Sequence, residues 1–315
     1  MRRALFALSL SLLTAAPLAA GAQTRPAITG LAFFRDYTTQ TAAAEKFYGP
    51  TMGFPEMKSP DGTLVFPVNK SQWVEVLTTP DPKPNDRMAA VGFTVRDVHA
   101  MERYLNAKGY PTAEPMHDNE FAVKDPEGYL VYFVESPYPT ATGDKTLAGI
   151  PKMVAASQPL PSATSHRMIH AGFVVNDRSK EDVFWKQTLG FKPYWHGWQK
   201  DPAANGDDYV SMQVPDGTDW IEYMLNQHNP DLRQTGVMNH FSLGTEHMQT
   251  VLAQLQKNEC TEKACTSIQA GRDGKIQLNL YDPDLTRVEY MEFSNAMKPC
   301  CSDFTGTMPG PRESE

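Results

Sequence analysis

The sequence predicts an α+β protein of two tandem domains, each built from two strand–helix–strand–strand–strand (βαβββ) units. Three observations predict this fold. Residues 28–136 and 166–293 repeat one order of landmarks, such as Trp73-Val-Glu75 and Trp220-Ile-Glu222. Within each copy, short runs of β-branched and aromatic residues surround single stripes of helical periodicity. The 315 residues are also enough for two ordinary domains with sizeable cores.

The repeat extends beyond that one landmark. Phe33 precedes Phe47 by 14 residues, and His170 precedes Phe184 by the same interval. The segment that begins at Ala90 corresponds to the one that begins at His240. Asp-Pro turns follow at the same place in both copies, at Asp125-Pro126 and Asp282-Pro283. Agreement of several landmarks in one order makes a chance match improbable.

Each element of the second copy follows from a local pattern. Its first helix should close at Gly190, a residue type that suits a helix C-terminal cap, and its second helix carries an apolar stripe with helical spacing. The expected strands are 168–176, 192–198, 209–214 and 220–225, then 239–244, 266–270, 276–281 and 287–293; the expected helices are 177–188 and 245–257. The first copy follows the same order, with helices at 41–48 and 98–108.

Three segments fall outside the two copies. Residues 1–22 combine a basic start, an apolar stretch and small residues before Gln23, which is typical of a secretory signal peptide. Residues 137–165 are rich in Pro, Ala, Thr and Ser and predict a linker. Residues 294–315 are polar, with Gly and Pro, and predict a flexible C-terminal tail. A periplasmic or secreted location is therefore expected, with no membrane contact after cleavage of the signal.

The charge and the cysteines restrict the range of functions. A formal net charge of -8 gives no electrostatic support for nucleic-acid binding. Exported proteins meet an oxidising compartment, so the cysteines predict one or two disulfides that tie the tail to the second domain. A zinc site is the alternative, and the sequence does not choose among the pairings. The cysteines are Cys260, Cys265, Cys300 and Cys301.

The second copy carries four residues that are candidate metal ligands. His170, Glu222, His240 and Glu289 stand where the first copy has Phe33, Glu75, Ala90 and Tyr132. If the fold needed these side chains, both copies would have them. Two imidazoles and two carboxylates form a donor set that suits one divalent ion, namely Ni, Zn, Co, Mn or Fe(II).

Each of the four residues also has an ordinary structural explanation. A histidine on an apolar strand is often a hydrogen-bonded core residue, and a carboxylate there can face solvent or find a partner. The joint occurrence at four equivalent landmarks favours coordination. Glu75 remains in the first copy as a lone carboxylate with a structural or solvated role. The methionines near the candidate ligands are interpreted as core residues. They are Met212, Met224, Met238 and Met291.

These motifs resemble the vicinal oxygen chelate superfamily, which includes glyoxalase I, extradiol dioxygenases and bleomycin-binding proteins. The resemblance rests on Phe47-Tyr48 with Gly53-Phe54, on Phe184-Trp185 with Gly190-Phe191, and on the two Asp-Pro turns. It implies sheets that curl around a cleft, with a metal between the paired units. The order of the four ligands is similar to the His, Glu, His, Glu set of bacterial glyoxalase I.

The resemblance implies three alternative functions. The first is an exported, glyoxalase-like isomerase or lyase for a small molecule with adjacent oxygens, in which Glu289 or Glu222 moves a proton. The second is an Fe(II) extradiol dioxygenase that uses two histidines and one glutamate, although the histidine of that class's signature is missing between Lys275 and Pro283. The third is a non-catalytic small-molecule binding protein.

Two features bear on partners. The segment 194–208 is longer than its counterpart in the first copy and contains Trp195, His196 and Trp198. It is expected to form either an aromatic lip over the cleft or a surface hairpin. The first domain is interpreted as a scaffold, a regulatory pocket or a dimer interface, so a second copy of the chain is an expected partner beside the small molecule.

Overall fold

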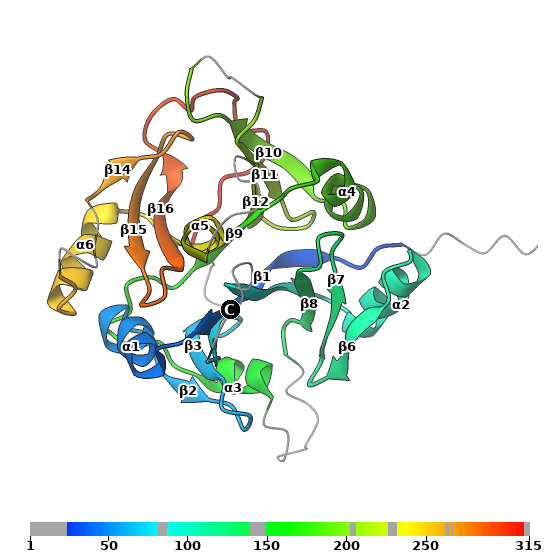
Figure 1. Ribbon diagram of the computed structural model, residues 1–315, viewed down its shortest axis with the longest axis horizontal. Helices are drawn as coiled ribbons and strands as arrows, with labels where there is room; N and C mark the ends of the chain where they lie inside the picture. The colour runs from blue at the N-terminus through cyan, green and yellow to red at the C-terminus, as the bar shows by residue number, and fades with distance from the viewer. Residues whose placement is uncertain are drawn as a thin grey trace, which may run out of the picture.

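Each copy of the repeat forms one eight-stranded curled sheet in the computed structural model (Figure 1). The structure describes residues 24–80, 87–138, 149–201, 206–225, 232–261, 265 and 267–311. The expected signal peptide, residues 1–22, lies outside these residues. The two βαβββ units of each copy join through their first strands, β1 with β5 and β9 with β13. The expected α+β architecture is confirmed.

The first sheet has the strand order β2-β3-β4-β1-β5-β8-β7-β6. Its strands are β1 (Ile28–Thr38), β2 (Met57–Lys58), β3 (Leu64–Asn69), β4 (Gln72–Thr78), β5 (Met88–Val95), β6 (Thr112–His117), β7 (Glu120–Lys124) and β8 (Leu130–Glu135). The central strands are buried on both faces, which suits their apolar and β-branched composition.

The second sheet repeats this order as β10-β11-β12-β9-β13-β16-β15-β14. Its strands are β9 (Met168–Val174), β10 (Lys192–Gly197), β11 (Tyr209–Gln213), β12 (Trp220–Met224), β13 (His240–Thr245), β14 (Gln269–Ala270), β15 (Lys275–Tyr281) and β16 (Arg287–Asn295). Identical strand order in the two sheets confirms that the sequence repeat is a structural repeat.

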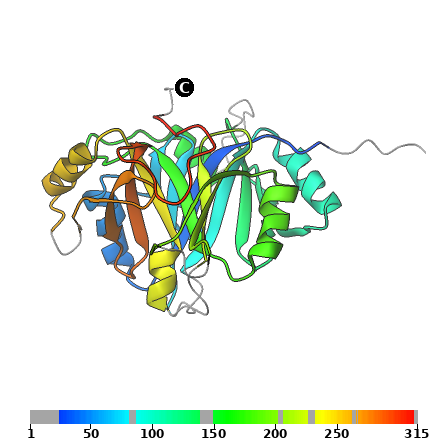
Figure 2. The same ribbon diagram turned by 90° about the horizontal axis from the view of Figure 1, so that it is seen from above.

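Helices pack on the outer side of the sheets (Figures 1 and 2). They are α1 (Thr41–Lys46) with η1 (Phe47–Thr51), α2 (Val98–Ala107), α4 (Arg178–Asp182) with η2 (Val183–Thr188), and α6 (Met248–Lys257). Asp97 caps α2 by accepting from the amide of Ala100 at 2.7 Å. Two further helices, α3 (Ile150–Ala156) and α5 (Leu232–Met238), were not predicted; α3 shows that the expected linker contains a helix.

The first helix of each copy ends in a π-helical segment, η1 or η2. A glycine with positive φ follows each one, Gly53 at 75° and Gly190 at 78°. Residues with a Cβ rarely adopt this left-handed conformation. A side chain on Gly53 would also collide with the backbone of Ser162. The repeated Gly-Phe motif is therefore a structural requirement of the helix end.

The Asp-Pro turn of each copy forms hydrogen bonds with the other copy. Asp284, in the turn of the second copy, accepts from the Thr39 amide of the first at 3.1 Å. Glu127, in the turn of the first copy, accepts from the amides of Asn176 and Asp177, each at 2.6 Å. One apolar core also spans the two copies, with Phe93 packed against both Trp185 and Phe191. The copies are therefore joined by buried contacts as well as by the linker.

A buried acidic pair lies at this junction. Asp36 and Asp282 are hydrogen-bonded to each other, and Tyr48 donates to Asp36 at 3.1 Å. Burial, followed by the charge of Asp282, raises the pKa of Asp36 well above its ordinary value. Burial raises the pKa of Asp282 to about 6. The pair therefore holds a proton in the folded protein at pH values where the unfolded chain has lost it.

Asp36→Asn should make the protein less sensitive to alkaline pH. A carboxyl group whose folded pKa is raised stabilises the fold below its unfolded pKa, and this contribution is lost as pH rises through the folded pKa. Asparagine keeps the hydrogen bond to Asp282 without titrating. We expect urea unfolding to show that the stability of the variant relative to wild type is greater at pH 8.5 than at pH 5, because the loss in wild type begins above the unfolded pKa of 3.8. An unchanged difference at the two pH values would contradict this assignment.

The C-terminal segment packs against the second sheet, so the expectation of a flexible tail is wrong for residues 294–311. Residues up to Asn295 belong to β16. Phe304 packs against Tyr194 with ring centroids 4.9 Å apart, and the Thr305 amide donates to the carbonyl of Tyr194 at 2.9 Å. The prediction rested on the polar composition of the segment, but two of its apolar residues, Phe304 and Met308, pack against the core. None of the helices within the described residues is long and apolar enough to cross a membrane.

Candidate metal centre

The four predicted ligands lie on the four central strands of the second sheet. Strands β12, β9, β13 and β16 are consecutive neighbours and carry Glu222, His170, His240 and Glu289 in that order. Two rows of register partners cross these strands, and residues two apart on a strand share a face. One row is Trp220, His170, Ser242 and Glu289, and the next is Glu222, Gly172, His240 and Arg287.

Donor atoms of His170, Glu222 and His240 all lie within 4.8 Å of one another, and Glu289 lies against the two histidines. His170 Nε2 lies 3.0 Å from His240 Nε2 and 3.3 Å from Glu289 Oε2. His240 Nε2 lies 3.8 Å from both Glu222 Oε2 and Glu289 Oε2. Ligands at the usual distances from a tetrahedral divalent ion are about 3.4 Å from one another. The spacing of the donor atoms of His170, Glu222 and His240 therefore suits a single divalent ion, with Glu289 beside the two histidines.

Two neighbours of His240, Met238 and Gly172, orient its ring for coordination. Its Nδ1 lies 2.6 Å from the carbonyl oxygen of Met238, so Nδ1 carries the proton and Nε2 presents a lone pair. Gly172 provides the necessary space, because a Cβ there would lie 2.1 Å from Cε1 of His240. These contacts place an unprotonated nitrogen at the point where the other donor atoms meet.

The electrostatics of the cluster also suit a cation. Burial lowers the pKa of His170, and burial with the charge of Arg287 holds that of His240 well below its usual range. Burial, then the charge of Glu289, raises the pKa of Glu222 to about 8. Burial would raise the pKa of Glu289 as well, but Arg287 and His170 outweigh it and the net shift is downward. Imidazoles whose pKa values are lowered and buried carboxyl groups are the donors that a divalent ion binds, and the guanidinium of Arg287 is the cation that lies beside them.

In the first copy, a different set of residues occupies the positions that correspond to the candidate metal ligands. Register partners place Phe33, Glu75, Ala90 and Tyr132 where the second copy has its ligands, which confirms the equivalence predicted from the repeat. There the guanidinium of Arg35 fills the space. It pairs with Glu75 at 2.5 Å and donates to the Tyr132 hydroxyl at 3.0 Å. Glu75 is thus one partner of a buried ion pair, which agrees with the structural role, one of the two that were predicted.

A cavity of about 300 Å³ opens onto the cluster. Its walls include Trp195, Tyr209, Gln277 and Phe304. Trp195 therefore belongs to a lip over the site, as one alternative predicted, whereas His196 is half exposed and pairs with Asp207 at 2.8 Å. Sequence reasoning missed the contribution of the tail, because Phe304 lies outside both copies of the repeat.

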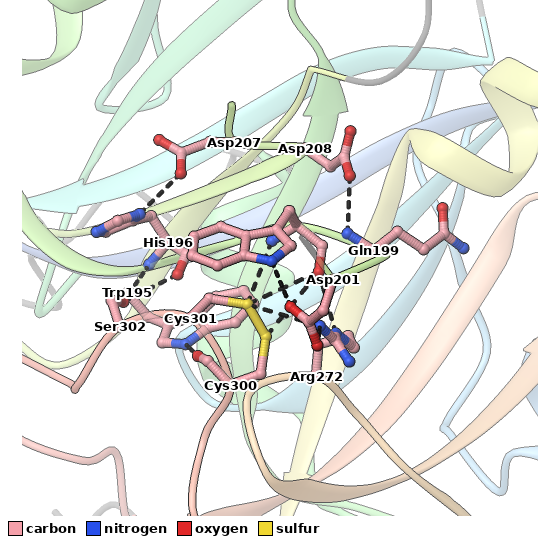
Figure 3. Close-up of a disulfide and its surroundings, with 11 residues drawn as sticks. Trp195, His196, Gln199, Asp201, Asp207, Asp208, Arg272, Cys300, Cys301 and Ser302 are labelled. Atoms are coloured by element: carbon pink, nitrogen blue, oxygen red, sulfur yellow. Dashed lines mark hydrogen bonds and ion pairs between the residues drawn. A yellow bond between two sulfur atoms is a disulfide. The ribbon is translucent and has the colours of Figure 1, made fainter. Parts of the chain in front are cut away.

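The cysteines pair locally, as Cys260–Cys265 and Cys300–Cys301. The prediction that disulfides exist is supported, but the prediction that they tie the tail to the domain is wrong. Tail contacts near the second pair are made instead by hydrogen bonds: Trp195 Nε1 donates to the Cys300 carbonyl at 3.3 Å, and the Cys300 amide donates to the Arg272 carbonyl at 2.8 Å. Figure 3 shows this adjacent disulfide among residues of the lip and Arg272.

Replacing both Cys300 and Cys301 by serine should loosen the lip without unfolding the domain. A disulfide between neighbours closes so short a loop that it restricts the unfolded chain little. It holds Cys301 at a positive φ of 75°, and Cys301 Sγ accepts from the Trp198 amide at 3.5 Å. Hydrogen exchange should therefore quicken in residues 195–201 and 298–305. Replacing Cys260 and Cys265 by serine is the matched control and should quicken exchange only near its own loop; equal effects would contradict the local role.

Comparison with known proteins agrees with this fold. Residues 31–133 match the family model described as the Glyoxalase/Bleomycin resistance protein/Dioxygenase superfamily. A search of curated protein sequences gives no match. Solved structures that resemble the chain include a 2,3-dioxygenase, LapB, from Pseudomonas sp. KL28, with 16% identity, a TM-score of 0.60, and coverage of 92% of this chain and 97% of that chain.

Two other similar structures are also dioxygenases. A catechol 2,3-dioxygenase has 12% identity and a TM-score of 0.63, with 91% of this chain and 97% of that chain covered. An extradiol ring-cleaving dioxygenase from B. fuscum has 17% identity and a TM-score of 0.59, with 85% and 73% covered. At these identities the likeness establishes the fold. The family match covers the first copy of the repeat, and the whole chain shares the tandem two-domain fold of these structures.

Proposed function

We propose that the chain is a divalent-metal enzyme that binds a small substrate through two adjacent oxygens and moves a proton on it. The observation that carries this proposal is the cluster of four donor side chains beside a cavity of about 300 Å³, three of which, His170, Glu222 and Glu289, line the cavity. Such a cavity accommodates a small molecule. An ion bound there would act as a Lewis acid toward the substrate oxygens and stabilise developing negative charge.

The geometry distinguishes the two glutamates. Glu289 Oε2 lies 3.3 Å from His170 and stands in the same register row. Glu222 Oε2 lies further out, 3.8 Å from His240, and its other oxygen accepts from Ser211 Oγ at 3.3 Å. We assign Glu289 as a fixed ligand and Glu222 as the carboxyl group that leaves the ligand set to carry the proton.

Glu222→Gln should retain metal and lose turnover. The amide can still donate its oxygen toward the site but cannot exchange a proton, so a loss of about 10²–10⁴-fold in kcat is expected. Glu289→Gln, the comparison variant, should lose metal first. Metal content by elemental analysis and anaerobic turnover of α-oxo compounds would separate the two effects. Full activity of Glu222→Gln would remove the proton-transfer role, and binding without turnover in wild type would favour a binding protein.

Fe(II)-dependent ring cleavage is the second candidate. His170, His240 and Glu289 form the tighter part of the cluster and would serve as a two-histidine, one-carboxylate set. The similar solved structures are dioxygenases of the same tandem fold. Glu222 is the departure, because it takes a position that oxygen and catechol would need. Oxygen consumption with catechols by the iron-loaded protein would select this reaction, and turnover of α-oxo compounds without oxygen would select proton transfer.

We also propose that the protein works outside the cytoplasm. The basic and apolar character of residues 1–22 supports export. The two cysteine pairs support an oxidising environment, where disulfides form and persist. Sequencing the N-terminus of the protein from the native cell fraction tests this, because export predicts a start near Gln23.

A further inference from the structure

Arg287 lies against the nitrogen that the metal would use. It is the register partner of His240 on the neighbouring strand β16. A terminal nitrogen of its guanidinium lies 2.8 Å from His240 Nε2, and the side chain lines the cavity. Because His240 Nδ1 carries the proton, Nε2 accepts this hydrogen bond with its lone pair. The same lone pair cannot bind a metal at the same time.

Arg287 also lacks the carboxylate partner that other buried or half-buried arginines have. Arginines in such places pair with an aspartate or glutamate within 4.0 Å, namely Arg25, Arg35, Arg87, Arg167, Arg178 and Arg272. Within the part of the chain that the structure describes, Arg287 has no such pair. Its Nε is buried and without a hydrogen-bond partner there. Among the described residues, the one hydrogen bond of its guanidinium toward the cluster is therefore the one to His240.

The repeat shows that this arginine is not a feature of the fold. The position equivalent to Arg287 in the first copy is Leu130, the register partner of Ala90. The arginine of the first copy, Arg35, comes from the position of Gly172 and is fully paired with Glu75. An unpaired guanidinium beside the ligands is thus specific to the second copy, the copy that has the ligands.

We propose that Arg287 is a resident cation that competes with the divalent ion for His240, and that an anionic ligand relieves this competition. This inference rests on the proposed metal site. A guanidinium keeps its charge throughout the accessible pH range, so it repels a bound ion at close range and must turn away when the ion enters. Inside the cavity its planar set of donors would then suit a carboxylate of the ligand.

The competition couples two binding events. If an anion draws the guanidinium away from His240, it strengthens metal binding, and by linkage the metal strengthens anion binding by the same factor. The class of substrate follows from this coupling. It is an anion whose carboxylate reaches Arg287 while two adjacent oxygens reach the metal. A neutral molecule with the same two oxygens would leave Arg287 on His240. The metal would therefore be bound more weakly in its presence than in the presence of the anion.

The test measures metal affinity, which does not depend on knowing the reaction. Co²⁺ is titrated calorimetrically into the metal-free full chain, in wild type, Arg287→Met and Arg272→Met. Methionine keeps the bulk of the side chain and removes its charge. Arg272 is the matched control, since it also lines the cavity but pairs with Asp201 at 3.0 Å. Each titration is repeated with benzoate and with its neutral analogue benzamide, and circular dichroism checks that each variant is folded.

We expect Arg287→Met to bind Co²⁺ at least tenfold more tightly than wild type, and Arg272→Met to stay within about threefold of wild type. Benzoate should strengthen Co²⁺ binding in wild type, benzamide should not, and neither should act on Arg287→Met. Equal or weaker binding by Arg287→Met would overturn the competition while leaving the metal site in place. Equal strengthening of both proteins by benzoate would overturn the coupling. If no protein binds Co²⁺, the metal site itself fails, and this inference fails with it.

Discussion

His240→Ala should lose its metal and, with it, turnover. His240 Nε2 lies within 3.8 Å of the donor atoms of the other three ligands, so its loss opens the centre of the set. Loss of a residue that only hydrogen-bonds to a ligand costs about 10- to 100-fold in metal affinity, and loss of a ligand itself should cost at least about 100-fold. Co²⁺ titration and elemental analysis measure the loss, and assays with α-oxo compounds and catechols measure its consequence.

His196→Ala is the control for that result. His196 lies in the same domain, half exposed, and pairs with Asp207 rather than with the cluster. It should bind metal like wild type. If His240→Ala retained wild-type metal affinity, or if both variants lost metal equally, coordination by the cluster would be contradicted.

Arg87→Met should produce the largest loss of stability. The Arg87 side chain is fully buried between the two copies, 3.6 Å from Asp282 and 3.9 Å from Asp284, and it donates to Thr286 Oγ1 at 2.8 Å. Removing one partner of a buried ion pair leaves uncompensated charge, which costs about 3–5 kcal/mol. The free energy of unfolding from urea titration should fall by that amount.

Arg178→Met gives the matched comparison. Arg178 pairs with Asp207 at 3.0 Å, but its side chain is 40% exposed. Exposed ion pairs contribute about 0–1 kcal/mol, so this variant should unfold near the wild-type midpoint. Similar losses in the two variants would mean that the Arg87 cluster does not hold the copies together.

Much of the fold and of the candidate site could be predicted because the two copies of the repeat can be compared with each other. The first copy retains the strand and turn residues, such as Trp73 and Asp125, while differing at the ligand positions. Residues present in both copies indicate the fold, and residues present only in the second, such as His170 and His240, indicate chemistry. The structure places those residues on adjacent central strands, as this reasoning requires.

Features that depend on contacts between distant segments could not be predicted. Arg287 is two residues from Glu289 and looks like an ordinary strand residue until register places it beside His240. Phe304 gave no periodic signal, yet it packs against Tyr194 and lines the cavity. The different roles of Glu222 and Glu289 likewise could not be assigned without the distances between their oxygens and the histidines. Sequence spacing states which residues share a face, but not how far their atoms reach.

The proposed function depends on one divalent ion bound by His170, Glu222, His240 and Glu289. An anomalous-scattering map from crystals of the Co²⁺-loaded protein tests it most directly. The map should show one strong peak at about 2.0–2.2 Å from the histidine Nε2 atoms and from at least one of the two carboxylates. A strong peak elsewhere, for example at the group formed by Asp201, Cys300 and Cys301, with none between the two histidines, would contradict it.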